Sequence, residues 1–536
     1  MIRPPAPSLL ASCAAAVAIF LLAGVRSHGQ DPGQLRTRLY PYPLPPVDQG
    51  VLAGEGLGPA VSTRASVARV TSAAAMLDRS GQSGSTYSAG RVIVKFRDGT
   101  SSAVRLSSLA RMSAVRPESE RPSYANFELV QIDANDDVEA VAETLRQRPE
   151  VEYAQPAYRI RKLFVPNDAL YRQFQWNLPL IDMERAWDIQ GTAGSSVTVA
   201  VLDTGVAFEN TVIRFTAHAF TDDLGNNHPA LGPIDVPFAA ASDLFAPGRF
   251  VAPRDFIWND DDALDLDGHG THVSGTLGQL TNNSFGAAGV AFNVKLMPVK
   301  VVASDWDAIF GAPQLGSDDT VARGIRYAAD NGAKVINLSI GRTGPPSPVI
   351  EDAVKYAVRK GTFIAVAGGN EFEDGNSPDV IAEIASRVDG AVSVGAVDRA
   401  KNHAFYSTTG ASIELVAPGG STRGFGREGA IVQQTLNFAD FGFCLVEPRV
   451  CGVPASFSPP RFDVFAFFGF QGTSMASPHV AGLAAMLIQQ GITDPAAIEA
   501  AMKRFATDLG APGRDDVYGY GLIEARDTLR GLGLAR

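Results

Sequence analysis

The sequence contains few cysteines and no long basic run, and both shortages exclude classes of protein. Cysteine occurs three times in 536 residues, at Cys13, Cys444 and Cys451. The spacing of these cysteines does not fit a structural zinc site, and no second pair is present. Lys and Arg number 46 against 57 Asp and Glu, which gives a net charge of −11. We therefore expect no nucleic-acid partner.

The N-terminus has the features of a targeting segment. Arg3 precedes an apolar run from about Leu9 to Val25, and small polar residues follow that run. This order is typical of a secretory signal peptide, which we assign to residues 1–30. A single-pass membrane anchor is the alternative, because the run is near the lower length limit for spanning a bilayer. Most of the run follows Cys13 rather than preceding it, which argues against a lipoprotein processing site.

Composition and periodicity divide the rest of the chain into three parts. Residues 31–89, with stretches such as YPYPLPPVDQG, predict a poorly ordered spacer. Residues 90–162 predict a small α+β domain, because β-like segments flank an amphipathic helix that starts near Asp137. Residues 163–536 alternate helices with strands rich in Val, Ile and Ala, such as SVTVAVLD and TFIAVAGG. That pattern predicts an α/β fold with a parallel sheet covered on both faces, hence three layers.

The predicted sheet also indicates where function should gather. In parallel sheets, ligands and catalytic groups lie at the carboxyl ends of the strands. Asp203, Asn370 and the region of Ser339 all follow predicted strands. Two stretches, at about 208–255 and 421–470, interrupt the alternation, and we expect them to be long surface loops or insertions.

Three short motifs supply the parts of a serine nucleophile with its base. AVLDTGV places Asp203 just after a buried strand, DGHGTHVSGT places His269 at a helix start, and GTSMASPHVAG places Ser474 at the mouth of an apolar helix. Taken alone, Ser474 is interpreted as a helix N-cap. A nucleophile, however, needs a base, and the base needs an orienting acid. The presence of all three motifs in the order Asp, His, Ser favours the catalytic interpretation.

In these motifs the chain resembles the subtilisin-like serine proteases, over about residues 167–529. The resemblance implies that Asp203 orients, that His269 is the general base and acid, and that Ser474 is the nucleophile. Asn370, in IAVAGGNEF, matches the family position whose side-chain amide forms half of the oxyanion hole, although alone it would be interpreted as a turn residue. The backbone N–H of Ser474 would be the other donor, at a helix N-terminus that stabilises negative charge.

The same resemblance assigns two walls of a substrate cleft. Ser339, Ile340 and Gly341 resemble the edge segment that pairs with substrate as an added strand, and Ala367, Gly368 and Gly369 resemble the opposite wall. The residues that form the floor of the pocket are not assigned, because SPDVIAEIASRVDG departs from the Tyr-Pro pattern of many subtilases. Asp267, two residues before His269, either favours a basic neighbour in the substrate or is a solvated loop acid.

Two further histidines lie in the motifs. His272 is three residues after His269, which allows a metal pair, but the glutamate of a metalloprotease motif is absent. We expect His272 and His479 to pack inside their helices.

The loop LTNNSFGAAGVA resembles a subtilase calcium loop, in which oxygen atoms bind a hard cation. The resemblance implies a structural Ca²⁺ held by the side chains of Asp168, Asp243 and Asn283 and the carbonyls of Leu280, Phe285 and Ala287. A second site is considered at Asp255, Asp260 and Asp262, where a solvated acidic loop is an equal alternative.

The domain at residues 90–162 resembles the inhibitory prosegment of this family, with a ferredoxin-like fold. That resemblance implies a zymogen cleaved between about Tyr158 and Val165, which acts on polypeptides and is inhibited by its own prosegment. We expect a monomer, secreted to the extracellular space or periplasm, with no stable membrane span after signal removal. Cys444 and Cys451 would then form a disulfide, or else remain two buried thiols. YGYGLIEARDTL resembles the closing elements of the family, so no C-terminal accessory domain is expected.

Two other functions fit the sequence less well. An esterase would use a G-x-S-x-G elbow, which is missing around Ser474. A non-catalytic binding protein on the same scaffold should have lost at least one of Asp203, His269, Asn370 and Ser474, and all four are present.

Overall fold

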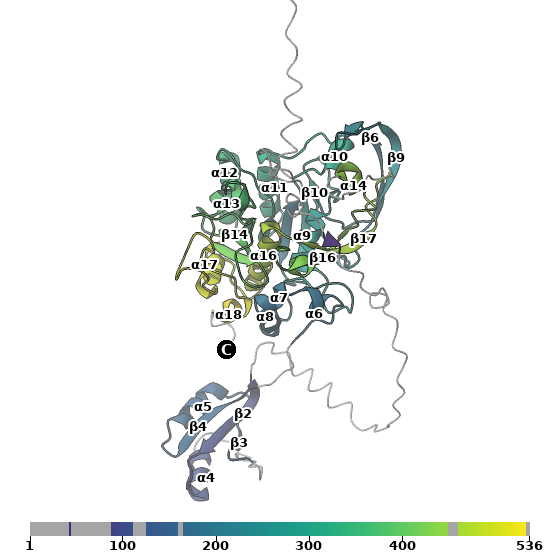
Figure 1. Ribbon diagram of the computed structural model, residues 1–536. Coiled ribbons are helices and arrows are strands. Elements are labelled where there is room, and N and C mark those ends of the chain that lie inside the picture. Colours follow the sequence, from purple (N-terminus) through teal and green to yellow (C-terminus); the bar gives the residue numbers. More distant parts are fainter. Residues whose placement is uncertain (1–41, 44–86, 111–124, 159–163, 449–458, 532–536) are drawn as a thin grey trace, which may run out of the picture. The chain divides into compact units, whose positions relative to one another are not determined.

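The computed structural model describes residues 42–43, 87–110, 125–158, 164–448 and 459–531 (Figure 1). The chain divides into two compact units. The larger unit contains Phe164–Leu532 and the pair Tyr42–Pro43, and the smaller unit contains the described residues from 87 to 158. The predicted signal segment, most of the predicted spacer, and Cys451 lie outside the described residues.

A seven-stranded parallel sheet forms the centre of the larger unit, as the sequence predicted. Its strands, in spatial order, are β10 (Arg254–Asp255), β11 (Lys295–Lys300), β5 (Thr198–Asp203), β12 (Val335–Leu338), β13 (Phe363–Ala367), β14 (Ala391–Val397) and β15 (Leu415–Pro418). The chain leaves β5 toward β11 on one side and continues at β12 on the other. The carboxyl ends of β5 and β12 are therefore a topological switch point, where open α/β sheets bind ligands.

Alternate residues of β5 face two different cores. Val199 and Val201 belong to the first core, while Ala200 and Leu202 belong to the second. The first core is covered by α8 (Met183–Ile189), α9 (His269–Gly278) and α16 (Thr473–Gln489), and the second by α11 (Asp318–Asp330), α12 (Pro348–Arg359) and α13 (Val380–Ala385). The unit thus has the three layers that the apolar strands predicted (Figure 1).

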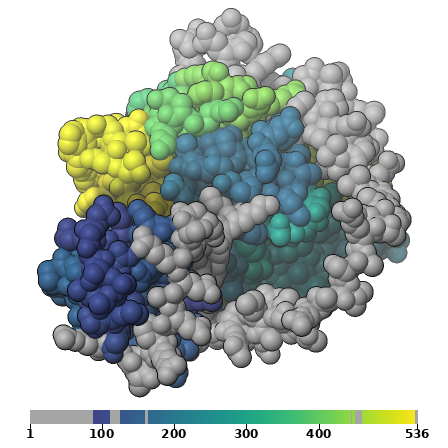
Figure 2. All heavy atoms as spheres, turned by 90° about the horizontal axis from the view of Figure 1, so that it is seen from below, coloured from purple at the N-terminus to yellow at the C-terminus, as the bar shows by residue number. Residues whose placement is uncertain are grey.

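The helices at the start and end of this unit pack at one end of the first core, the lower end in Figure 1. Short helices α6 (Tyr171–Phe174) and α7 (Asn177–Leu180) precede α8, and α17 (Pro495–Phe505) and α18 (Ala525–Arg530) follow α16. Helix α18 packs against α8. In Figure 2 yellow C-terminal residues accordingly lie beside mid-blue residues of the larger unit.

The two stretches expected to be loops instead contain antiparallel strands. The first holds a hairpin of β6 (Thr211–Ala217) and β9 (Leu231–Phe238), with β7 (Phe220–Thr221) and β8 (Asn227–His228) between them. The second holds β16 (Ile431–Leu436), α14 (Phe443–Val446) and β17 (Phe465–Phe470), and Tyr42–Pro43 (β1) pairs with β17. The hairpin escaped prediction because β6 alternates only half-buried with exposed residues, which gives a weak apolar signal.

The smaller unit is an α+β domain of the kind expected. It contains β2 (Tyr87–Phe96), α4 (Ser102–Ala110), β3 (Glu128–Gln131), α5 (Val138–Arg146) and β4 (Val151–Tyr158). The strands pair antiparallel in the order β3-β2-β4. Asp137 caps α5 by accepting from the main-chain nitrogens of Glu139 and Ala140, as its position in the sequence indicated.

Candidate active site

Asp203 and His269 meet at the carboxyl end of β5. Asp203 is the last residue of β5 and is fully buried, while His269 is the first residue of α9. The Asp203 Oδ1 atom lies 2.7 Å from His269 Nδ1 and also accepts from Thr204 N at 2.8 Å. A carboxylate on Nδ1 fixes the imidazole orientation and leaves Nε2 available as a base.

The charges around His269 favour its protonated form. Burial alone lowers the pKa of His269, but the charge and hydrogen bond of Asp203, with the charges of Asp267 and Asp265, raise it to about 9. Asp267 accepts a hydrogen bond from His269 N at 3.0 Å. Burial, with the nearby charge of Asp265, raises the pKa of Asp267 to about 7. The imidazolium that forms when this histidine takes a proton is therefore strongly stabilised.

Ser474 is the second residue of α16, and it does not cap that helix. Gly472 is the N-cap residue, with φ of 153°, a backbone conformation that favours glycine. The Ser474 hydroxyl donates instead to the carbonyl oxygen of Ser339 at 3.0 Å, and Ser339 Oγ donates to Ser474 O at 2.7 Å. Among the described residues none accepts from Ser474 N, so this N–H at a helix N-terminus remains available.

Asn370 follows β13 and faces the same helix start. Its Oδ1 accepts from Thr473 N at 2.9 Å and from Thr473 Oγ1 at 3.0 Å. Since the oxygen of the amide is used in this way, the Nδ2 donor is the end left for a ligand. Ser474 N belongs to the first turn of α16, and Asn370 is bonded to Thr473 at the start of the same helix. Both donors, Asn370 Nδ2 and Ser474 N, thus belong to residues at a helix N-terminus, where the helix dipole favours negative charge.

The predicted cleft walls follow two adjacent parallel strands. Ser339, Ile340 and Gly341 come after β12. Ala367 is the last residue of β13, and Gly368 and Gly369 follow it. Because β12 and β13 are parallel neighbours, both segments lie at the same edge of the sheet, with Ser474 bonded to the first. Gly369 N also donates to Thr473 Oγ1 at 3.2 Å, which joins the second wall to α16.

Two carboxylates that were not predicted from the sequence, Asp379 and Glu371, lie next to residues of the site. A Cβ on Gly341 would lie 1.9 Å from Asp379 Oδ2, so this position has no room for a side chain. Asp379 is buried and caps α13 through Ile381 N and Ala382 N. Glu371 Oε2 accepts from Asn370 N at 2.6 Å, which fixes the backbone of that asparagine. For Asp379, the departure of SPDVIAEIASRVDG from the family pattern was the available signal; Glu371 lies outside that stretch.

The residues predicted to bind calcium gather around two buried carboxylates. Asp243 Oδ1 accepts from Asn283 Nδ2 at 2.7 Å, and Asp243 Oδ2 accepts from Ala287 N at 3.0 Å. Asp168 accepts from the main chain of the same loop, at Asn282 N and Asn283 N. Burial raises the pKa of Asp243 to about 7 against these hydrogen bonds, and the charge of Asp168 adds to the rise. All the predicted ligand atoms are oxygens, as Ca²⁺ prefers, but the groups that bond the two acids in this structure are N–H donors, so calcium binding stays a prediction.

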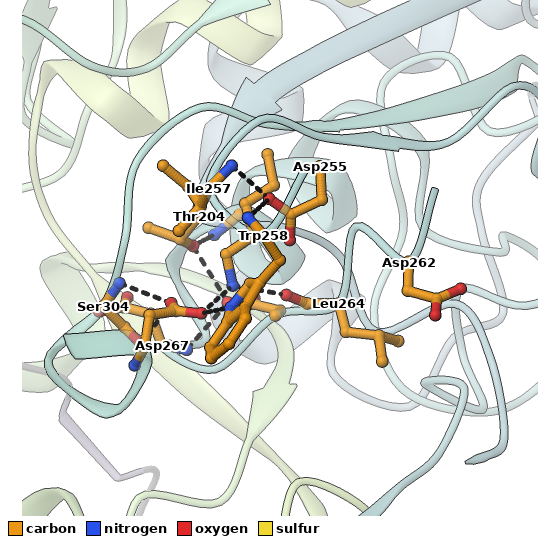
Figure 3. Close-up of polar contacts among 12 residues, drawn as sticks. Thr204, Asp255, Ile257, Trp258, Asp262, Leu264, Asp267 and Ser304 are labelled. Atoms are coloured by element: carbon orange, nitrogen blue, oxygen red, sulfur yellow. Dashed lines mark hydrogen bonds and ion pairs between the residues drawn. The ribbon is translucent and has the colours of Figure 1, made fainter. Parts of the chain in front are cut away.

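The second acidic stretch is arranged differently. Asp255 is buried and accepts from Ile257 N and Trp258 N, whereas Asp262 is exposed and points away from this cluster (Figure 3). Asp260 Oδ1 accepts from Asp262 N. Burial raises the pKa of Asp255 to about 7, against the smaller opposing effect of the charge of buried Lys300. Among the described residues, no three His, Cys, Asp or Glu side chains gather as metal ligands.

The two further histidines of the motifs, His272 and His479, are buried in the larger unit. His272 Nε2 lies 3.1 Å from Ile431 O, and its ring stacks on Phe470. His479 Nδ1 lies 2.8 Å from Met475 O. Burial lowers the pKa of His272 to about 3 and that of His479 to about 4, so both rings are neutral. The disulfide stays a prediction, because Cys451 and the side chain of Cys444 are outside the described part.

Comparisons with known proteins match both units. The model of the Subtilase family matches residues 194–521, and that of the Fervidolysin N-terminal prodomain matches residues 74–157. The chain is 30% identical over 435 residues to the Thermophilic serine proteinase of Bacillus sp. (strain AK1), which covers 81% of this chain and 86% of that protein.

Two further similarities have the same character. Thermitase of Thermoactinomyces vulgaris is 30% identical over 351 residues, 65% of this chain and 94% of its own. A solved protease structure from Pseudoalteromonas arctica is 26% identical, with a TM-score of 0.49, and covers 69% of this chain and 99% of that one. No helix among the described residues is long and apolar enough to cross a bilayer.

Proposed function

This chain belongs to the subtilase family of serine endopeptidases, and we propose that Asp203, His269 and Ser474 are its catalytic triad. The observation that carries the proposal is the 2.7 Å contact between Asp203 and His269 at the carboxyl end of β5, next to β12, whose following residue Ser339 is bonded to Ser474. The substrate class is polypeptide, and the reaction is acyl transfer to water through a serine ester.

The proposed mechanism begins with the hydroxyl of Ser474. It turns from the carbonyl of Ser339 toward His269 Nε2, which takes its proton as Oγ attacks the scissile carbonyl carbon. The resulting oxyanion accepts hydrogen bonds from Asn370 Nδ2 and Ser474 N. His269 then gives the proton to the leaving amine. A water molecule, deprotonated by His269, attacks the acyl carbon, and His269 returns that proton to Ser474 Oγ as the acid is released. Asp203 keeps its hydrogen bond to His269 Nδ1 throughout and stabilises the imidazolium.

Substrate recognition in this proposal uses the two walls described above. The substrate residues before the scissile bond pair, as an added strand, with Ser339, Ile340 and Gly341. The side chain of the residue at the scissile bond then enters between this segment and the opposite wall, formed by Ala367, Gly368 and Gly369. Strand addition reads the peptide main chain, so it supports endopeptidase activity on extended segments. Small residues on the second wall leave space for a large side chain.

The smaller unit is proposed to be an inhibitory prosegment over residues 90–162, preceding a catalytic domain at 163–536. Its similarity to the Fervidolysin N-terminal prodomain supports this role. With the signal at residues 1–30, the chain would be a secreted zymogen, extracellular or periplasmic. The mature enzyme would act as a monomer with a structural Ca²⁺ held by Asp168, Asp243, Asn283 and the carbonyls of Leu280, Phe285 and Ala287.

Maturation provides a direct experiment. The closing end of the prosegment would be the first substrate of Ser474, so wild type should separate into a prosegment fragment and a mature enzyme beginning near Asn167. Ser474→Ala should accumulate uncut, and the isolated prosegment should inhibit mature enzyme in trans. If purified Ser474→Ala still matured at the same junction, free of other proteases, self-cleavage would be wrong and a separate processing enzyme would be needed.

A further inference from the structure

One buried carboxylate, Asp265, fastens the loop that carries His269. It is 1% exposed, and neither the triad motifs nor the predicted calcium ligands include it. Its two oxygens accept five hydrogen bonds from groups on both sides of His269 and from the residue after Asp203. Oδ1 accepts from Asp267 N (3.0 Å), Gly268 N (2.9 Å) and Thr204 Oγ1 (3.0 Å), and Oδ2 accepts from Thr271 N (2.9 Å) and Thr271 Oγ1 (2.6 Å).

The partners of Asp265 connect onward to the turn after Asp203. Thr204 Oγ1 accepts from Gly270 N at 3.0 Å, and Thr271 Oγ1 accepts from Ala207 N at 2.9 Å. We call the two segments 203–207 and 263–271 the acid–base corner. Each threonine hydroxyl in this corner donates to Asp265 and accepts from the opposite segment. The carboxylate therefore joins both segments rather than one.

The backbones in this corner approach too closely for side chains to separate them. A Cβ on Gly205 would lie 2.3 Å from Leu264 O, and a Cβ on Gly270 would lie 2.1 Å from Gly205 O. Val206 N donates to Ala263 O at 3.0 Å. Glycine at both positions thus permits the contact that the Asp265 hydrogen bonds hold in place.

A buried lysine, Lys300, also bonds the acid–base corner, through the main chain of Leu264. Lys300 Nζ donates to Leu264 O at 2.9 Å and to Asp307 Oδ1 at 2.8 Å, and both charged side chains are fully buried. Trp258 Nε1 also donates to Asp307 Oδ1 at 2.7 Å. Figure 3 shows Trp258 and Leu264 within this network. Burial lowers the pKa of Lys300, but Asp307, Asp255 and Asp265 raise it above its ordinary value. The lysine therefore stays charged and balances these carboxylates, Asp265 included.

We propose that Asp265 is a positioning residue for catalysis, which sets the distance and angle between Asp203 and His269 by holding the acid–base corner closed. It acts through Thr204 and Thr271 and does not touch substrate. The geometry is sensitive because Asp203 Oδ2 has no hydrogen-bond partner among the described residues, so Oδ1 alone carries the bond to His269. The inference rests on the proposed roles of Asp203 and His269.

The test replaces Asp265 by an isosteric residue with fewer acceptors. In Asp265→Asn one oxygen becomes an NH₂ donor, which cannot accept from its neighbours. The displaced His269 should lower kcat by up to about a hundredfold, because small misplacements of reacting groups cost that much, with KM unchanged. Proton NMR of the His269 Nδ1–H should show a shifted or broadened resonance. Asp261→Asn, an exposed carboxylate of the same stretch, is the matched control and should change neither value.

A second variant covers the case in which Asp265→Asn does not fold. Thr271→Val keeps the side-chain volume but removes the hydroxyl between Asp265 and Ala207 N, and should lower kcat several-fold in the folded protein. The inference is overturned if folded Asp265→Asn, or folded Thr271→Val where the first is unstable, keeps wild-type kcat and the wild-type resonance. A wild type that fails to hydrolyse protein would instead refute the proposed function, which separates the two failures.

Discussion

The two sides of the candidate site are held by different means. On the acid–base side, His269 is joined to Asp203 at 2.7 Å, and the hydrogen bonds of Asp265 close the corner around both. On the nucleophile side, Asn370 is fixed by Thr473, but the Ser474 hydroxyl rests on the carbonyl of Ser339 at 3.0 Å. The base is thus oriented in advance, whereas the nucleophile has to turn toward it.

This difference indicates which side tolerates change. We expect a histidine held by a hydrogen-bond network to shift when a member of that network is removed. A serine hydroxyl has a single rotatable bond, so its movement costs little once substrate approaches. Variants on the two sides should therefore differ in how they divide their effect between kcat, KM and pH dependence.

The largest effect should follow removal of either central group. We expect Ser474→Ala and His269→Ala each to lower turnover by roughly a million-fold, and the double variant to lose little more, because triad members act as a unit. The rate of peptide hydrolysis measures this. The matched control is His272→Ala in folded protein; a loss as large as that of His269→Ala would mean that the base is misassigned.

Loss of one oxyanion donor should cost less. Asn370→Ala should reduce kcat by about a hundred- to a thousandfold, since Ser474 N remains as the second donor. Asn370→Asp keeps an oxygen facing Thr473 and removes the Nδ2 donor, so it should lose activity to a similar degree. Steady-state kinetics with one peptide substrate compare the two. Near wild-type kcat in both variants would remove Asn370 from the mechanism.

A smaller effect is expected on pH dependence. His269 acts as a base only when neutral, and its pKa is raised to about 9, so kcat/KM should rise with pH toward that value. Asp267→Asn removes a negative charge that favours the imidazolium. The pKa of His269 should therefore fall, and the acid limb of the kcat/KM profile should move to lower pH. Asp261→Asn should leave the limb in place, and an unmoved limb in Asp267→Asn would contradict the electrostatic account.

The smallest effect on chemistry should come from removal of calcium. A cation held at about a hundred times its Kd stabilises a protein by about 2.7 kcal/mol, so a chelator should lower Tm without changing kcat well below Tm. Because the pKa of Asp243 is raised to about 7, the cation-free protein should lose stability as pH rises through that value. The chelator effect on Tm should accordingly be larger at pH 8 than at pH 5. If neither chelator nor added calcium changed Tm, the proposed calcium site would be excluded.

Most of the central sheet could be predicted from the sequence, because its strands are buried on both faces. β5, β12, β13 and β14 are runs of Val, Ile, Leu and Ala without polar alternation, and such runs are visible in a single sequence. The hairpin of β6 and β9 could not be predicted in this way, since much of it stays half-exposed. Its strands are defined by their pairing across the hairpin rather than by burial.

The candidate site was predictable to the extent that motifs fix it. The three motifs indicated Asp203, His269 and Ser474, but nothing in the stretch DDALDLDGHG distinguishes a carboxylate that accepts five hydrogen bonds from a solvated loop acid. Asp265 is buried and Asp262, three residues before it, is exposed, yet both are aspartates in the same acidic stretch of the sequence. Likewise, Lys300 at the end of a strand is identified as a buried counter-charge only when Asp307 and Leu264 O are seen around it.

The most direct test of the account is covalent labelling of the matured protein with an organophosphonate, followed by mass spectrometry of its peptides. The proposed triad predicts one adduct, on Ser474, whose formation requires His269 and is lost in His269→Ala. It also predicts that labelling and hydrolysis of a protein substrate disappear together as the reagent is added. An adduct on another residue, or hydrolysis that persists after complete labelling of Ser474, would contradict the account.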